Sequence, residues 1–356
     1  MHTNRIALLS LVVAAGTARA GGSYYRLSTD AKYVAPFTVD TGASSGIVIE
    51  DSYGYFFPMT FSAKAGWVPT TSRIPGTHAY NGLGLSVAVD YDIHALYVFE
   101  TEDGGIYSNY SLDNGVTWRT SWCHISSDYQ FDSAPAAVYV GSNAFRVYAR
   151  ASDALIEIKT NGCGEIASQV IGATLAPPIA LSWGPGRVDI FGTYGATLEW
   201  IETSDATNYQ THTSFQMSDG TMKSFTVANA PGSLAATTPG SDRLEVVFCD
   251  GHHVWRLGYV DGWFIQPLLT ASSAMVSAAN EFDDPYETPA AAAVFTEAGQ
   301  PVMAFDLNDD GTLAAHQLQV PGTTFSVFAE GLMSTPIENM VYGISGTNLY
   351  VFSGLD

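Results

Sequence analysis

The segment Pro177-Pro178-Ile179-Ala180-Leu181 is the clearest copy of a pattern that runs through the chain, a proline followed by small or apolar residues. Five other segments share the pattern: Ala35-Pro36-Phe37, Ala134-Pro135-Ala136-Ala137-Val138, Ala230-Pro231-Gly232, Thr288-Pro289-Ala290 and Thr335-Pro336-Ile337. A related segment without proline, Leu85-Ser86-Val87-Ala88-Val89, lies between the first two along the chain. The segments recur about every 50 residues, so the chain is built from imperfect repeats.

Each repeat contains further strand signals. A second strand is expected about ten residues after the proline, as in Phe145–Tyr148, Arg187–Phe191, Arg243–Phe248 and Asn348–Phe352. The turns Asp103-Gly104, Asp250-Gly251 and Asp310-Gly311 contain residue types that favour tight hairpins. Repeats of about 40 to 60 residues with about four short strands are typical of β-propeller blades, whose sheets bury both faces only against neighbouring sheets.

We therefore predict an all-β, seven-bladed β-propeller, with six blades as the alternative. The composition agrees, because 34 Gly, 19 Tyr, 18 Phe and only 14% charged residues indicate a β-rich chain with many turns. The last repeat ends at Asp356, just after its expected third strand. Residues Ser23–Ser28 can supply the missing outer strand, which would close the ring and remove an exposed sheet edge. This closure favours seven blades over six.

The N-terminus has the features of a secretory signal peptide: Arg5, the apolar run Ile6–Ala15 and small residues up to Ala20. The apolar run is too short to span a bilayer as a helix. We expect residues 1–20 to be removed and residues 21–356 to form one secreted propeller domain. Without Arg5 and Arg19 the chain carries 12 basic and 35 acidic side chains, a net charge of −23. This charge argues against nucleic acid and membrane surfaces as partners.

Two further features are relevant if the protein is secreted: a pair of cysteines and a glycosylation sequon. Cys123 and Cys163 flank consecutive repeats and can form a disulfide in an oxidising compartment, whereas Cys249 lies in an apolar run and is expected to be buried. Asn109-Tyr110-Ser111 is a glycosylation sequon, so Asn109 is a candidate for glycan attachment.

The segment Ser111-Leu112-Asp113-Asn114-Gly115-Val116-Thr117-Trp118 matches the S-x-D-x-G-x-T-W pattern of the Asp-box. It resembles the turns of sialidases and many other propellers. In those turns the Ser and Asp fix a hairpin while the Trp packs between blades, so the resemblance implies a structural role.

Two repeats resemble those of the propeller lectins, notably the fucose-binding families. The residues that carry the resemblance run from Leu181 to Phe191 and from Gly195 to Trp200, and the spacing recurs around Arg146 and Glu157. The resemblance implies that the pairs Arg146–Glu157 and Arg187–Glu199 bind sugar hydroxyls, while an aromatic ring covers the apolar face of the sugar. The candidate rings follow Gly-containing turns and belong to Trp67, Trp118 and Trp263. An Arg–Glu pair on a sheet surface is the alternative interpretation of both pairs.

A second resemblance points to catalysis. Ser72-Arg73-Ile74-Pro75 is similar to a motif of sialidases whose Arg binds the substrate carboxylate. By this resemblance Arg73, Arg187 and Arg243 would form an arginine triad, and Asp90 or Asp92 would be the acid. Ser72 replaces the aromatic residue of the motif, and the sequence does not identify the required Tyr–Glu nucleophile pair.

The segment Asp306-Leu307-Asn308-Asp309-Asp310-Gly311 has the D-x-N-x-D-G spacing of a calcium loop. Asp306, Asn308 and Asp310 are therefore weak Ca²⁺ candidates, with a solvated acidic turn as the alternative. Otherwise the sequence indicates no metal and no cofactor.

These observations favour a secreted lectin with sugar sites between blades over an enzyme. A sialidase-type glycoside hydrolase and a small-molecule cyclase or isomerase, using the central pocket of the propeller, are the alternatives. The expected partner is a carbohydrate or another small molecule, and the sequence does not define the oligomeric state.

Overall fold

We describe the fold from a computed structural model. The structure describes residues 23–28, 30–40, 44–62, 66–69, 73–76, 82–172, 178–182, 186–205, 207–230, 232–240, 243–280, 290–295, 302–308, 313–318, 327–331, 340–345 and 347–353. The signal peptide predicted over residues 1–20 lies outside these ranges. The described residues form strands and turns without a helix, which confirms the all-β prediction.

The strands form seven antiparallel four-stranded sheets. In chain order we number them I to VII. Sheet I contains β2 (Tyr33–Asp40), β3 (Ser44–Glu50), β4 (Phe56–Ser62) and β5 (Gly66–Pro69). Sheet II contains β6 (Leu85–Asp90), β7 (Ala95–Glu102), β8 (Gly105–Ser111) and β9 (Cys123–Ser126). Sheet III contains β10 (Ala136–Tyr139), β11 (Phe145–Ala151), β12 (Ala154–Thr160) and β13 (Glu165–Gly172).

The remaining sheets repeat this order. Sheet IV contains β14 (Ile179–Ser182), β15 (Val188–Tyr194), β16 (Thr197–Thr203) and β17 (Gln210–His212). Sheet V contains β20 (Leu234–Gly240), β21 (Arg243–Cys249), β22 (His253–Tyr259) and β23 (Trp263–Thr270). Sheet VI contains β24 (Met275–Asn280), β25 (Ala290–Phe295), β26 (Val302–Leu307) and β27 (Leu313–Leu318). Sheet VII contains β28 (Val327–Gly331), β29 (Met340–Ser345), β30 (Asn348–Ser353) and β1 (Ser23–Ser28).

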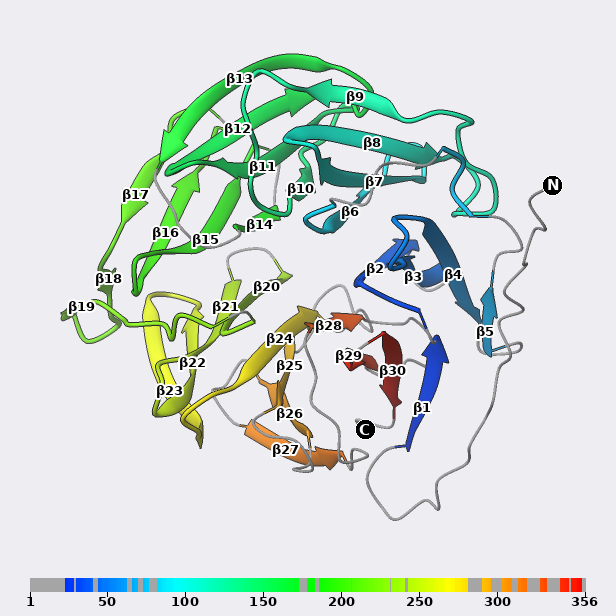
Figure 1. Ribbon diagram of the computed structural model, residues 1–356. Helices are drawn as coiled ribbons and strands as arrows, with labels where there is room; N and C mark the ends of the chain where they lie inside the picture. The colour runs from blue at the N-terminus through cyan, green and yellow to red at the C-terminus, as the bar shows by residue number, and fades with distance from the viewer. Residues whose placement is uncertain are drawn as a thin grey trace.

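The sheets are arranged as a ring, which is the architecture of a β-propeller (Figure 1). The first strands β2, β6, β10, β14, β20, β24 and β28 contact one another in this order, and β28 contacts β2. The N-terminal strand β1 pairs with β30, with Ser23 opposite Ser353, and so supplies the outer strand of sheet VII. This pairing is the closure expected from the sequence.

Packing between neighbouring sheets explains why the inner strands are apolar on both faces. All eight residues of β7 are buried, because one face packs on sheet I and the other on sheet III. The turn from β7 to β8 is tight, with φ of 48° at Asp103 and 77° at Gly104, as the Asp-Gly pair predicts. Each sheet therefore depends on its neighbours for its core.

The antiparallel order gives the ring two ends. At one end the first strand turns into the second and the third into the fourth, and we call this the 1–2 end. At the opposite end, the 2–3 end, the second strand turns into the third. Side chains near the start of a second strand, such as Arg146 on β11, therefore lie at the 1–2 end.

One segment interrupts the repeat. Between sheets IV and V the chain forms a two-stranded sheet of β18 (Phe215–Gln216) and β19 (Met222–Lys223). This insertion bonds to both neighbours, since Leu198 N–H donates to the Phe225 carbonyl and Ser218 N–H donates to the Trp263 carbonyl. No helix in the described part of the chain is long and apolar enough to cross a membrane.

Candidate functional site

Three successive sheets place a polar pair at the same position of the hairpin between their second and third strands. The pairs are Arg146–Glu157, Asp189–Trp200 and Glu245–Arg256, and in each the partners lie diagonally across the two strands. All three pairs face the following sheet in the ring, so each lies at an interface between two sheets. We call these positions the diagonal pairs.

The diagonal pair at the III/IV interface is Arg146 and Glu157, with Arg146 Nε 3.0 Å from Glu157 Oε1. Glu157 is fully buried and also accepts hydrogen bonds from Gln169 Nε2 (2.6 Å) and from the hydroxyl of Tyr209 (2.5 Å), which comes from sheet IV. The Arg146 side chain is 15% exposed. The interface therefore holds a fixed acceptor with a guanidinium at its rim.

The buried Tyr148 and the partly buried Tyr209 complete this network. The hydroxyls of Tyr148 and Tyr209 lie 3.0 Å apart. Burial, together with the nearby Tyr148 and Glu157, raises the pKa of Tyr209, so its phenol stays protonated and donates to Glu157. Tyr148 and Tyr209 were not identified from the sequence. Tyr148 lies opposite Glu157 in the β11–β12 hairpin and Tyr209 precedes β17 of the next sheet, so both roles become visible only once the register and the order of the sheets are known.

The IV/V interface holds a more open group. The Trp200 indole N–H donates to Asp189 Oδ1 at 2.8 Å, and Asp189 is fully buried. Arg187 Nε lies 3.1 Å from Asp189 Oδ2, and its Nη2 lies 3.4 Å from Glu202 Oε2. His212 Nε2 lies 3.0 Å from Glu202 Oε1, and its ring stacks on Trp200 with centroids 4.6 Å apart. Arg187, Glu202 and His212 are each about 30% exposed and can be reached from solvent.

The V/VI interface holds a sealed group. Glu245 accepts from Arg256 at 2.9 Å and 2.7 Å and from Arg243 at 2.9 Å, and all three side chains are buried. The two guanidinium groups also donate to the carbonyls of Leu307 (2.6 Å) and Asn308 (2.9 Å) of sheet VI. Burial and complete hydrogen bonding give this group a structural role.

The predicted pair Arg187–Glu199 is wrong. Glu199 lies opposite Gly192 in the hairpin, and from that register it points to the face that packs on sheet III, whereas Arg187 points toward sheet V. The spacing of 12 residues is one longer than the 11 of the diagonal pairs, and a shift of one residue moves a side chain to the other face. Arg187 instead pairs with Asp189 and Glu202.

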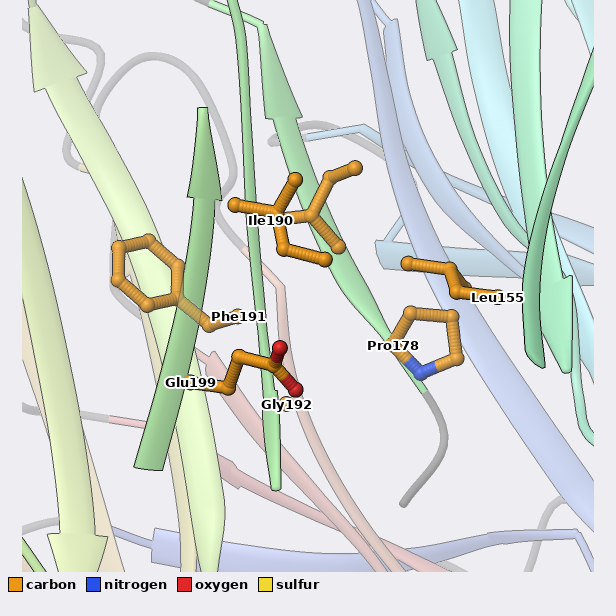
Figure 2. A pocket seen from close by; sticks show the side chains of 7 residues that line it. Leu155, Pro178, Ile190, Phe191, Gly192 and Glu199 are labelled. Atoms are coloured by element: carbon orange, nitrogen blue, oxygen red, sulfur yellow. The ribbon is translucent and has the colours of Figure 1, made fainter. Parts of the chain in front are cut away.

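Glu199 lines a small, mostly apolar pocket between sheets III and IV (Figure 2). The pocket walls include Leu155, Pro178 and Ile190. Glu199 is 6% exposed, and burial raises the pKa of its carboxyl group. The pocket is too narrow and too poor in polar side chains for a sugar ring.

The three tryptophans proposed to stack on sugars do not offer an open ring face. The exposed fractions of Trp67, Trp118 and Trp263 are 7%, 9% and 2%. Trp67 packs on Phe61 and Tyr342, and Trp263 packs edge-on against Trp200. A tryptophan after a turn fits both a sugar platform and a core residue, and here the core contacts account for all three.

The residues of the sialidase hypothesis are not brought together. Arg73 follows the fourth strand of sheet I and lies over the ring of Tyr55 in the turn from β3 to β4, which is at the 2–3 end. Asp90, Arg187 and Arg243 lie at the 1–2 end, and each belongs to a different sheet. The structure therefore contradicts an arginine triad of Arg73, Arg187 and Arg243.

The calcium hypothesis rests on residues that the structure describes only in part. Asp310 and the side chain of Asp306 lie outside the described residues. The carbonyl of Asn308 accepts from the Arg256 guanidinium, which places a buried positive charge beside the turn. Among the described residues, no group of three or more His, Cys, Asp and Glu side chains could hold a metal ion.

The Asp-box turn follows β8 and has the expected hydrogen bonds. Asp113 accepts from Ser111 (2.8 Å) and from the Thr117 amide (2.7 Å), and the Trp118 indole donates to the Gly115 carbonyl (2.9 Å). A degenerate relative occurs at the same place in sheet IV, where Asp205 accepts from Thr203 and from the Thr207 amide. Both turns fix hairpins, in agreement with the structural role that the resemblance implies.

The two predictions linked to secretion have different outcomes. Cys123 and Cys163 form a disulfide that joins sheets II and III, and Cys249 is a buried free thiol. Asn109 is fully buried in β8, and its Nδ2, the atom that would carry a glycan, donates to the Arg119 carbonyl at 3.2 Å. The structure therefore contradicts Asn109 as a glycosylation site in the folded protein.

No protein-family model matches the sequence, and no curated protein matches it. Among solved structures, the fold is similar to that of propeller lectins. The SapL1 lectin, in complex with alpha methyl fucoside, is 15% identical with a TM-score of 0.55, covering 83% of this chain and 97% of that chain. AofleA from Arthrobotrys oligospora is 12% identical with a TM-score of 0.55, covering 84% and 90%.

A fungal lectin of Aleuria aurantia, a six-bladed β-propeller with a fucose recognition mode of its own, is 16% identical with a TM-score of 0.50, covering 83% of this chain and 97% of that chain. At these identities the similarity shows a shared fold. It shows a propeller of the kind found in fucose-binding lectins, as the repeats suggested.

Proposed function

We propose that the protein is a secreted carbohydrate-binding protein whose sugar sites lie at the III/IV and IV/V interfaces. The arginine–carboxylate pairs Arg146–Glu157 and Arg187–Asp189 carry this proposal. Two successive interfaces place a partly exposed arginine beside a buried carboxylate, so a charged donor and a fixed acceptor meet at the same rim. Sugar hydroxyls both donate and accept hydrogen bonds, and such a pair satisfies both roles.

The IV/V interface is the stronger candidate of the two. Arg187, Glu202 and His212 present one cationic group, one carboxylate and one imidazole at intermediate exposure. At the III/IV interface Glu157 already accepts from Gln169 and Tyr209, which leaves Arg146 as the main contact for a ligand. We therefore expect unequal sites.

We further propose that the seven sheets are seven blades. The support is the ring of seven first strands and the β1–β30 pairing. The similarity to the six-bladed lectin, which covers 97% of that chain but 83% of this one, is consistent with one additional blade here. The N-terminal signal sequence and the Cys123–Cys163 disulfide support secretion.

A glycan array followed by isothermal titration with α-methyl fucoside, or with the best array ligand, tests the proposed binding. We expect Arg187→Ala to weaken binding by about tenfold or more and Arg146→Ala to weaken it less, because losing one charge-assisted hydrogen bond has about this effect. Arg150→Ala is the matched control, since Arg150 pairs with Asp132 at the opposite, 2–3 end of β11. An empty array, or equal losses for Arg187→Ala and Arg150→Ala, would contradict the proposal.

A further inference from the structure

The II/III interface has at its 1–2 end a group that the proposed sugar sites do not use. Asp90 is the last residue of β6 and lies opposite Ala95, whose side chain packs in the core between sheets II and III. The turn that follows contains Tyr91, which is 56% exposed, and Asp92, which is also exposed. Across the interface, Tyr139 ends β10, and its ring meets that of Tyr91 edge-on at a centroid distance of 6.4 Å.

Hydrogen-bond acceptors outnumber donors in this group. Asp90 Oδ1 accepts from the Asp92 amide at 3.0 Å, and Asp92 Oδ2 accepts from the Tyr139 hydroxyl at 2.6 Å. Asp90 is fully buried, and its Oδ2 has no hydrogen-bond partner. A buried carboxylate oxygen without a donor is costly, so this arrangement calls for an explanation.

The Tyr139 hydroxyl connects the two carboxylates. Burial and its hydrogen bond to Asp92, with a further contribution from Asp90, raise the pKa of Tyr139, so the phenol remains protonated. It has a single proton, which it gives to Asp92. Asp90 also acts on this hydroxyl, so its proton can turn to Asp90 when another donor binds Asp92.

No lysine or arginine neutralises the group within the part of the chain that the structure describes: neither Asp90 nor Asp92 forms an ion pair there. The site therefore combines two carboxylates, an exposed aromatic ring and a shortage of donors. A primary ammonium group has three N–H donors and a positive charge that is attracted to aromatic faces.

We propose that Asp92, Tyr91 and Tyr139, supported by Asp90, form a binding site for a primary ammonium group attached to an apolar carbon skeleton. The ammonium donates to Asp92, the Tyr139 proton turns to Asp90, and the ring of Tyr91 covers the adjacent carbons. An unacetylated amino sugar and a lysine side chain both present this chemistry. The site is separate from the III/IV and IV/V sites and does not depend on their binding a sugar.

Isothermal titration with glucosamine and with Nα-acetyl-lysine methylamide tests this site, with N-acetylglucosamine as the probe that lacks the ammonium. We expect at least one of the two amines to bind, and Asp92→Asn and Tyr91→Ala each to weaken that binding by about tenfold. Binding of glucosamine alone identifies an amino sugar as the source, and binding of the lysine derivative alone identifies a peptide.

Asp261→Asn is the matched control, because it removes the same charge from an exposed turn of sheet V. Arg187→Ala separates this site from the sugar sites, because the loss of amine binding caused by Asp92→Asn should be the same with and without Arg187→Ala. Thermal unfolding of each variant checks that the fold is retained. The proposal is overturned if neither amine binds, if Asp261→Asn weakens binding as much as Asp92→Asn, or if Asp92→Asn weakens N-acetylglucosamine and glucosamine equally.

Discussion

The V/VI and IV/V interfaces use the same hairpin positions for opposite purposes. At the V/VI interface Glu245 is held between Arg243 and Arg256, and the three side chains have little or no contact with solvent. At the IV/V interface Arg187 and Glu202 occupy the rim and are about 30% exposed. The same sheet geometry thus produces a closed ion group in one place and an accessible polar surface in the next.

The difference shows how a structural arginine–carboxylate pair in a propeller can be told from a candidate binding pair. Buried guanidinium groups must have their donors satisfied by the protein, as the Leu307 and Asn308 carbonyls do at the V/VI interface. Arg187 and Glu202, in contrast, face water and gain little stability from each other. Exposure, rather than residue type, separates a structural pair from a candidate binding pair.

The largest expected effect on stability comes from disrupting the buried ion group at the V/VI interface. Arg256→Met removes the fully buried guanidinium and leaves Glu245 with Arg243 alone, so the free energy of unfolding should fall by about 3 kcal/mol. Urea denaturation measures this change. A loss below about 1 kcal/mol, similar to that of a surface pair, would mean that the buried pair at the V/VI interface is no more structural than the exposed pair at the IV/V interface.

The I/II interface contains a buried group rich in carboxylates, in contrast to the group rich in arginine at the V/VI interface. Glu50, Glu100 and Glu102 are each at most 4% exposed, and Lys32 lies 3.4 Å from Glu50. Burial, reinforced by the neighbouring carboxylates, raises the pKa of Glu100 well above its ordinary value and that of Glu102 to about 7.

Because these folded-state pKa values lie above the unfolded ones, the protonated forms favour the folded state. The stability they contribute is fully present below about pH 4.5 and is lost as the pH rises through about 7. The temperature at the midpoint of thermal unfolding should therefore decrease as the pH is raised from 5 to 8. Glu102→Gln should make this temperature depend less on pH. A midpoint that rises over this range in the wild-type protein would refute the assignment.

A smaller effect is expected at the Asp-box. The Ser111 hydroxyl accepts from the Gly115 amide at 2.8 Å and is nearly fully buried, so Ser111→Ala should reduce stability by about 1 kcal/mol. Sugar titration should be unchanged, since this turn belongs to sheet II. Loss of binding in a folded Ser111→Ala protein would instead assign this turn to a ligand site.

The smallest effect on stability should come from the open interface. Arg187→Ala removes a partly exposed guanidinium, while the buried Asp189 keeps its hydrogen bond from the Trp200 indole, so the free energy of unfolding should change by no more than about 0.5 kcal/mol. The contrast with Arg256→Met is the sharpest test of the comparison. A large loss of stability for Arg187→Ala would mean that this arginine supports the fold rather than a ligand.

The repeats and the ring could be predicted from the sequence because each sheet needs apolar strands of similar length and tight turns. Pro135 and Pro178 do precede first strands, as expected. Pro289 instead precedes β25, the second strand of sheet VI, and Asn348–Ser353 is the third strand of sheet VII. Proline tolerates the start of either strand, so its position gives the period of the repeat but not its phase.

The candidate site was harder to predict for the same reason. Arg146–Glu157 was found because its spacing matches the hairpin register, whereas Arg187–Glu199 failed by one residue. Asp189, Glu202 and His212 carry no local signal, since they meet only across strands and sheets. Aligning the hairpins on their turns before comparing residues would have revealed all three diagonal pairs.

The β1–β30 pairing has a consequence for how the chain folds during synthesis. Of the described strands, β1 comes first along the chain and its partner β30 comes last, with Ser23 opposite Ser353. Until β30 is made, β1 has no sheet to join and can pair with a strand of another nascent chain. Closure of the ring through β1 therefore depends on the synthesis of β30.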